Sequence, residues 1–239
     1  MTENNEEKKK PQNRKPRRRR RRPRRRGGPK GPVIPVHGYL LVREKGSPML
    51  VSAKNNFVAV NSDPLVPMEL VNKWHLESGL RIEAKARGND RPRVFEFDTI
   101  EGMPPEEYRP KAVPFQELIS IDPLERFNLE TDPDVVEPRV TELIAPLGMG
   151  QRCLIVSPPK AGKTTLLQQM AHAIAANHPT TTIFVLLVDE RPEEVTDWKR
   201  SIARGEVFAS SSDQSLESHI HVSEMVFERA RRLVEMGED

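Results

Sequence analysis

The sequence predicts a β plus α/β fold, in which a small barrel of the oligonucleotide-binding type precedes the first part of a parallel α/β sheet with a phosphate-binding loop. Residues 80–97 alternate apolar and charged side chains around a Gly-Asn-Asp turn, which is typical of a half-buried β-hairpin. From residue 154 onward, short apolar runs alternate with amphipathic segments, as in a parallel sheet. Between the first run and the first such segment, Ser157–Thr164 ends in Gly-Lys-Thr.

Length and composition set the broad class of protein. The chain has 239 residues, of which 36% are hydrophobic, and this is enough to fill at least one core. Its single cysteine, Cys153, excludes a disulfide framework and a cysteine-rich zinc site. No apolar run approaches the roughly eighteen residues that a membrane span needs, and none follows the basic N-terminus as in a signal peptide. We therefore expect a soluble, cytoplasmic protein without a membrane partner.

Charge is strongly segregated along the chain. Residues 1–30 contain 15 lysines and arginines against three glutamates, a charge of +12, so the other residues carry −9 to give the net +3. We predict a disordered basic arm over residues 1–32, because so polar and charged a sequence has nothing to bury. Its arginine runs would bind the phosphates of RNA or DNA, and the alternative is a solubilising tail. The candidate RNA-contacting arginines are Arg17, Arg18, Arg19, Arg20, Arg21, Arg22, Arg24, Arg25 and Arg26.

Residues 33–112 are predicted to form the barrel. Short apolar runs at residues 39–42 and 57–60 predict two strands ahead of the hairpin. A helix before the hairpin is indicated by Pro67 near its first turn, by apolar residues at every fourth position and by Gly79 after it. Short strands with one helix before the last hairpin are typical of a five-stranded oligonucleotide-binding barrel.

The second half is predicted to contain a linker and a partial α/β domain. Residues 103–114 are rich in proline and charge, which suits a linker, and residues 113–150 form a lead-in with turn signals. Residues 151–239 then alternate between strands and helices. We expect strands at residues 154–156, 183–188 and 207–209, and helices with apolar faces around residues 166–174, 193–202 and 222–233.

The segment Ser157–Thr164 follows a predicted strand and opens a predicted helix, which is the context that a phosphate-binding loop requires. Backbone N–H groups and the positive end of the helix would hold the β-phosphate, Lys163 would reach the β- and γ-oxygens, and Thr164 would ligate Mg²⁺. The alternative is a turn that contains Gly-Lys-Thr by chance. Glu190 directly follows the second strand, where it would either deprotonate the attacking water or cap the next helix.

Two stretches of the chain resemble one known family. Gly150–Thr164, with the sequence GQRCLIVSPPKAGKT, and Val185–Thr196, with the sequence VLLVDERPEEVT, are similar to the bacterial transcription termination factor Rho family. The resemblance covers residues 113–239 closely and residues 36–112 loosely. It implies a cold-shock-like barrel ahead of a RecA-type motor, in a hexameric, RNA-dependent ATPase and helicase that uses ATP and Mg²⁺. The implied partners are single-stranded RNA, RNA polymerase and further copies of the chain.

The resemblance also implies roles for individual residues. Glu190 would be the general base, while Lys163 and Lys160 would lie at the phosphates. Arg191 would contact the nucleotide, and the turn before the first strand would line the same site. The implied nucleotide-contacting residues are Gly148, Met149, Gly150, Gln151, Arg152, Cys153, Lys160, Ala161, Gly162, Lys163, Thr164, Thr165 and Arg191. Cys153 is expected to be a packed strand residue rather than a nucleophile.

The sequence departs from the family's pattern in two regions. Residues 46–51 have the sequence GSPMLV in place of the family's aromatic-glycine motif, whose aromatic rings would stack on bases after the first strand. Phe57, Phe95 and Phe97 remain as aromatic candidates, although phenylalanine is more often a core residue, and Phe95 is the predicted RNA contact. The chain also stops before the family's second metal-binding carboxylate and arginine finger, so we expect a fragment of a Rho protein. An RNA- and ATP-binding piece without turnover is the alternative to an active ATPase, and a RecA-type motor on DNA is disfavoured by the two matching stretches.

Overall fold

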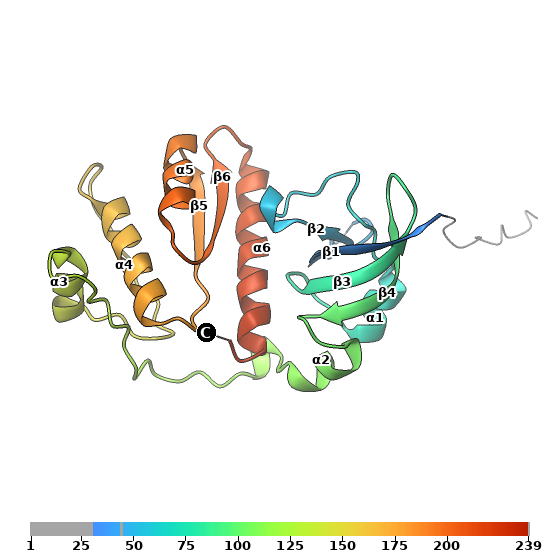
Figure 1. Ribbon diagram of the computed structural model, residues 1–239, viewed down its shortest axis with the longest axis horizontal. Helices are drawn as coiled ribbons and strands as arrows, with labels where there is room; N and C mark the ends of the chain where they lie inside the picture. Colours follow the sequence, from blue (N-terminus) through green and yellow to red (C-terminus); the bar gives the residue numbers. More distant parts are fainter. Residues whose placement is uncertain (1–30, 44, 239) are drawn as a thin grey trace, which may run out of the picture.

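The computed structural model describes residues 31–43 and 45–238. It consists of an antiparallel barrel in the first half of the chain and a small parallel α/β unit in the second half, with a long C-terminal helix between them (Figure 1). The predicted arm, with its candidate contacts Arg17–Arg22 and Arg24–Arg26, lies outside the described residues except for its last two positions.

The barrel is built on four antiparallel strands in the order β2-β1-β3-β4. These are β1 (Val33–Leu41), β2 (Met49–Val51), β3 (Arg81–Arg87) and β4 (Arg93–Ile100). Leu65 closes the ring, because it bridges Met49 of β2 on one side and Arg93 of β4 on the other. The backbone N–H of Val94 donates to the carbonyl of Leu65 at 2.8 Å. Five chain segments therefore surround one core.

The predicted hairpin is confirmed as β3 and β4. Side chains of β3 alternate between the core and solvent, and Ile82, Ala84 and Ala86 are at most 1% exposed. Helix α1 (Met68–Trp74) lies between the closing segment and β3, as the sequence predicts, and buries Val71 in the same core. The helix ends earlier than predicted, at His75 in the left-handed conformation.

Two predicted strands in the first half need correction. The first strand spans Val33–Leu41 rather than residues 39–42. Residues 57–60 are not a strand: a 3₁₀ turn η1 (Ala53–Asn55) is followed by Asn56 and Phe57 with φ of 48° and 59°. Residues at such angles leave the extended conformation that strand pairing needs. Phe57 is fully buried, so this apolar run contributes to the core through irregular backbone and not through a strand.

The region predicted to be a linker, residues 103–114, contains a helix. Helix α2 (Pro105–Lys111) begins with proline at its first position and has Glu106 and Glu107 in its first turn, both of which favour a helix start. Tyr108 is 3% exposed and packs into the barrel core. Burial raises the pKa of Tyr108 to about 12.

The second half forms a sheet covered by helices on both faces. After a short turn η2 (Phe115–Glu117) and α3 (Val136–Ile144), the elements are α4 (Lys163–Asn177), β5 (Phe184–Glu190), α5 (Pro192–Ser201), β6 (Glu206–Ser211) and α6 (Leu216–Glu235). Strands β5 and β6 are parallel. Leu187 and Ala209 face α4 and α5, whereas Phe184 and Phe208 face α6. The predicted alternation of strand and helix is confirmed from α4 onward.

The strand predicted at residues 154–156 is not formed. Residues 151–158 have no regular structure, and Leu154 and Val156 are 86% and 82% exposed. An apolar run becomes a buried strand only where neighbouring strands pair with its backbone. Among the described residues, β5 pairs with β6 alone, so the run has no such neighbour.

Candidate functional site

The loop that enters α4 presents unpaired backbone donors. Gly162 is the N-cap residue with φ of 86°, and no side chain caps the helix. No heavy atom outside its chain neighbours and the helix backbone lies within 4 Å of the position that a Cβ of Gly162 would occupy. The first N–H groups of a helix have no partner within the helix, and with the helix dipole they form an anion site. The Ser157 hydroxyl in the same loop is buried without a hydrogen-bond partner among the described residues.

Lys163 and Glu190 belong to one electrostatic neighbourhood. The pKa of Glu190 is raised above its ordinary value, first by burial and then by the charge of Glu194, while Lys163 acts in the opposite direction. Lys163 is the first residue of α4, and Glu190 is the last residue of β5. The charge of Lys163 therefore acts on the carboxyl group of Glu190, and sequence reasoning selected both residues as catalytic.

A bulge shapes the end of β5. Asp189 has φ of 59°, and the pairing of β5 with β6 shifts between Val188 and Glu190. An extra residue in a strand redirects the side chains that follow it, and bulges are common beside active sites. Glu190 pairs with Ser211, and its carbonyl accepts the N–H of Ser212 at 3.1 Å. The chain thus fixes the backbone that carries the carboxylate.

Thr164 lies in a cleft between α4 and α5. The cleft has a volume of about 430 Å³ and is also lined by Gln168, Glu194, Asp197, Arg200 and Ser201. Within the described part of the chain, no three histidine, cysteine, aspartate or glutamate residues are grouped to hold a metal ion. A Mg²⁺ ion at Thr164 would therefore take most of its ligands from water and from phosphate oxygens, as Mg²⁺ commonly does.

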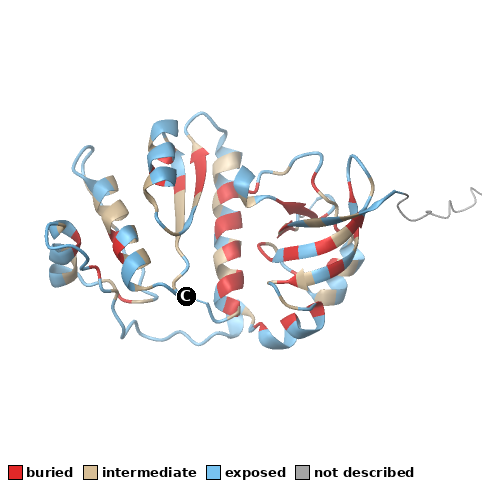
Figure 2. Cartoon of the chain, in the orientation of Figure 1, coloured by how far each residue is buried: buried red, intermediate tan, exposed pale blue. Residues whose placement is uncertain are grey.

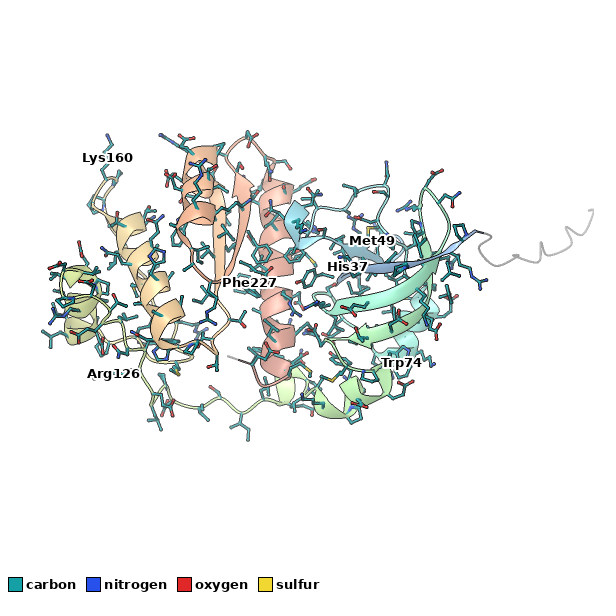
Figure 3. The ribbon with its side chains drawn as sticks, viewed as in Figure 1. His37, Met49, Trp74, Arg126, Lys160 and Phe227 are labelled. Atoms are coloured by element: carbon teal, nitrogen blue, oxygen red, sulfur yellow. The ribbon has the colours of Figure 1, made fainter. Side chains whose placement is uncertain are left out.

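The other candidate residues lie at the tip of the loop, at the start of α5 and in the turn at Gly148. Lys160 has φ of 63° and projects from the tip of the loop into solvent (Figure 3). Arg191 is the exposed N-cap residue of α5. The turn that starts at Gly148 is tied to the preceding segment, because Met149 donates its N–H to the Glu125 carbonyl at 2.8 Å. Cys153 is exposed, so its prediction as a packed strand residue is wrong. Without a strand at residues 154–156, nothing packs over it.

The barrel presents an aromatic and cationic surface on its outer face. The Arg87 guanidinium lies over the Phe95 ring, 4.8 Å from its centroid. Arg87 pairs across the sheet with Val33 of β1 and with Arg93 of β4. Phe57 and Phe97 are buried, which confirms their prediction as core residues, whereas Phe95 stays half-exposed. Sequence reasoning missed Arg87 and Arg93, although their outward positions on the hairpin would have indicated them.

Across the described residues, no helix combines the length and the apolar character that crossing a membrane requires.

Comparison with known proteins identifies similar chains. No family model matches the sequence. Proteins named transcription termination factor Rho are similar to it: the one from Aquifex aeolicus is 41% identical over 216 residues, covering 88% of this chain and 50% of the relative. The one from Chromobacterium violaceum is 41% identical over 217 residues, covering 88% and 51%. The one from Streptomyces coelicolor is 45% identical over 178 residues, covering 74% and 42%. The chain spans about half the length of the curated relatives that it matches first.

Proposed function

Because this chain belongs to the transcription termination factor Rho family, we propose that it supplies the RNA-binding and ATP-binding regions of an RNA-dependent ATPase and helicase. The whole protein would bind nascent RNA and use ATP hydrolysis to release it from RNA polymerase. It would work as a homohexamer in the cytoplasm, with Mg²⁺ as the metal cofactor.

The proposal assigns residues 33–112 to an RNA-binding barrel of the oligonucleotide-binding, cold-shock-like type. Support comes from the ring of five segments closed by Leu65, with α1 between the third segment and β3. The Arg87 and Phe95 pair supports an RNA-contacting face, since a base stacks equally on an aromatic ring and on a guanidinium plane. Residues 113–150 would lead into residues 151–239, as the beginning of a RecA-type ATPase domain.

The uncapped start of α4, where the charge of Lys163 acts on the carboxyl group of Glu190, carries the nucleotide side of the proposal. Lys163 would donate hydrogen bonds to the β- and γ-phosphate oxygens, and the N–H groups of α4 would bind the β-phosphate. The Thr164 hydroxyl would ligate Mg²⁺, which would neutralise charge on the phosphates. Glu190 would accept a proton from the attacking water. Its raised pKa makes it a stronger base than an ordinary glutamate once it is deprotonated.

A second candidate is a protein that binds RNA and ATP without turnover. The irregular backbone of residues 151–158 favours it, because a loop that lacks a paired strand before it is less firmly held for catalysis. The two candidates share every binding step and differ only in hydrolysis.

Equilibrium binding of Mg·ATP, followed by measurement of phosphate release with and without single-stranded RNA, tests both candidates. We expect Lys163→Ala to weaken nucleotide binding about 10-fold or more, since it loses charge-assisted hydrogen bonds. Glu190→Gln should bind nucleotide as tightly as the parent chain and reduce only hydrolysis. Lys199→Ala, on the exposed side of α5, is the matched control. Binding without phosphate release would favour the second candidate, and absence of nucleotide binding would exclude both.

A further inference from the structure

The barrel and the nucleotide-binding half share a hydrophobic core. The side of α6 that faces the barrel is a stripe of buried residues, visible along the helix in Figure 2. The shared core consists of Leu41, Met49, Val51 and Phe57 from the barrel half, with Phe208, Val222, Met225 and Val226 from the second half. The rings of Phe57 and Phe208 stack, with centroids 5.0 Å apart. The barrel therefore contacts both α6 and the parallel sheet.

A buried ion pair crosses this interface. The Arg229 guanidinium of α6 lies 2.6 Å from the Glu101 carboxylate, in the turn after β4, and the two side chains are 9% and 7% exposed. The same guanidinium lies over the ring of Tyr39, 5.2 Å from its centroid. A buried charge is tolerated only where an opposite charge stays beside it. Separating the two halves would leave both charges without this partner.

A second buried arginine of α6 lies one turn later and pairs with Glu77, whose side chain is 60% exposed. Arg232 is 2% exposed and lies 2.5 Å from Glu77 of the barrel half and 3.1 Å from Glu235 of its own helix. The Glu235 carboxylate also accepts the N–H of Phe115 at 2.9 Å. The end of α6 is thus held both to the barrel and to the segment that leaves it.

Backbones approach closely at the same interface. A Cβ at Gly79 would lie 2.5 Å from the carbonyl carbon of Glu228 and 2.7 Å from the nitrogen of Arg229. Only a glycine permits this contact between the barrel loop and α6. On its other side, α6 packs on β5 and β6, and β5 ends at Glu190. A continuous packed path therefore runs from the barrel through α6 to the candidate nucleotide site.

We infer that α6 joins the barrel and the nucleotide-binding half into a single cooperative folding unit, so that a ligand bound to either half stabilises the other. Domains within a chain move independently by default unless their interface is large and apolar. Here the shared core, the two buried arginines and the contact at Gly79 act together, so the halves lose their best contacts if they separate. The unfolding behaviour follows from the interface alone, while the ligand effect rests also on the proposed function.

Two tryptophans give each half its own probe. The chain contains only Trp74, in α1 of the barrel, and Trp198, in α5 beside the candidate site. Urea unfolding of Trp74→Phe reports on the second half, and unfolding of Trp198→Phe reports on the barrel. We expect the two fluorescence transitions, each compared with circular dichroism of the same variant, to coincide. Hydrogen exchange of β3 and β5 in the unsubstituted chain checks the same point if either variant folds poorly. Separate transitions, or different global opening free energies for β3 and β5, would overturn the inference.

Variants of the Arg229–Glu101 ion pair test whether this pair couples the unfolding of the two halves. Glu101→Gln and Arg229→Met should split the transition, with the Trp198 signal lost at lower urea, because the second half has the smaller cores of its own. Glu83→Gln is the matched control, since Glu83 pairs with Arg81 at 3.7 Å on the exposed face of β3. If the urea midpoints reported by Trp74 and by Trp198 fall by the same amount in Glu101→Gln, the ion pair does not couple the two halves as we infer.

Binding of a ligand to one half tests whether the two halves are coupled in stability or only lie in contact. A single-stranded RNA oligonucleotide at about 100 times its dissociation constant should raise the folding equilibrium constant about 100-fold, by the same amount at Trp198 as at Trp74. A shift at Trp74 alone would overturn the inference. If RNA shifts neither probe, it is the proposed RNA binding that fails, and the coincidence of the two transitions without ligand still decides the inference.

Discussion

Glu190 is held at the end of β5 in surroundings that disfavour its charge. Burial and the neighbouring carboxylates of Glu194 and Asp189 raise its pKa, and Lys163 offsets this only in part. A carboxyl group whose pKa is raised in the folded state is easier to keep protonated there than in the unfolded chain. The free energy of unfolding should therefore fall as the pH rises through that raised pKa.

Glu190→Gln is neutral at every pH and should lack this particular fall. The measurement is urea unfolding of the parent chain and of Glu190→Gln from about pH 4 to pH 8, which spans the range above an ordinary glutamate pKa. The two curves of stability against pH should diverge toward neutral pH, with the variant retaining more of its stability. Parallel curves would contradict the assigned surroundings of Glu190.

Phe95 should contribute to RNA binding through its half-exposed ring, beside the Arg87 guanidinium. Loss of one stacking partner costs about 1–3 kcal/mol per base, so Phe95→Ala should weaken binding of single-stranded RNA about 5- to 150-fold. Phe115→Ala is the matched control, because the Arg231 guanidinium lies over the Phe115 ring at 4.9 Å, but Phe115 belongs to η2 and not to a strand of the barrel. Fluorescence anisotropy of a labelled oligonucleotide measures both. Equal affinities of the two variants would remove Phe95 from the RNA-contacting face.

At the scale of elements, the sequence predicted those helices and strands that have a clear local periodicity. The β3–β4 hairpin has a strong period of two residues, and helices α5 and α6 have apolar faces with a period of about 3.6 residues, so local pattern alone indicated them. The strands predicted at residues 57–60 and 154–156 are absent from the structure for the same reason. A short apolar run is equally suited to a strand or to irregular packing, and the choice depends on whether a partner strand is available. The candidate site was found because its residues lie next to element ends in the sequence.

The role of α6 could not be predicted from the sequence. In the sequence, its arginines have the spacing of a solvent-exposed polar face, but Arg229 and Arg232 are buried in the structure. Their partners Glu77 and Glu101 lie more than a hundred residues earlier, and no local pattern connects them. Phe57 is a similar case, because its burial depends on Phe208 of β6.

The contact of α6 with Gly79 gives an element-scale prediction. Gly79→Ala should destabilise the protein through both a left-handed backbone angle and a clash with α6, while Gly46→Ala should suffer only the first effect. Gly79 and Gly46 have φ of 90° and 121°, and a Cβ at Gly46 would meet no atom within 4 Å. The clash should add about 1–3 kcal/mol of lost stability. Chemical denaturation of the two variants measures the difference, and equal losses would mean that α6 does not press on this loop.

At the scale of the whole molecule, charge separates a basic N-terminal segment from an acidic remainder. Residues 1–30 carry +12 in a chain whose net charge is +3. If their arginines bind phosphates, RNA affinity should fall steeply with salt, because each neutralised phosphate of a single strand contributes about −0.7 to the log–log slope. Deleting residues 1–30 should flatten this slope and weaken RNAs of different composition by a similar factor. An unchanged slope after deletion would leave this segment as a solubilising tail.

We propose that the chain carries two separate sites, one for single-stranded RNA on the barrel and one for Mg·ATP at the start of α4. The most direct test is a titration of Mg·ATP into the chain already saturated with single-stranded RNA, with the RNA signal followed at the same time. We predict that ATP binds to saturation without displacing the RNA, and that Lys163→Ala loses the nucleotide while it keeps the RNA. Displacement of RNA by ATP, or loss of both ligands in Lys163→Ala, would contradict the proposal of two separate sites.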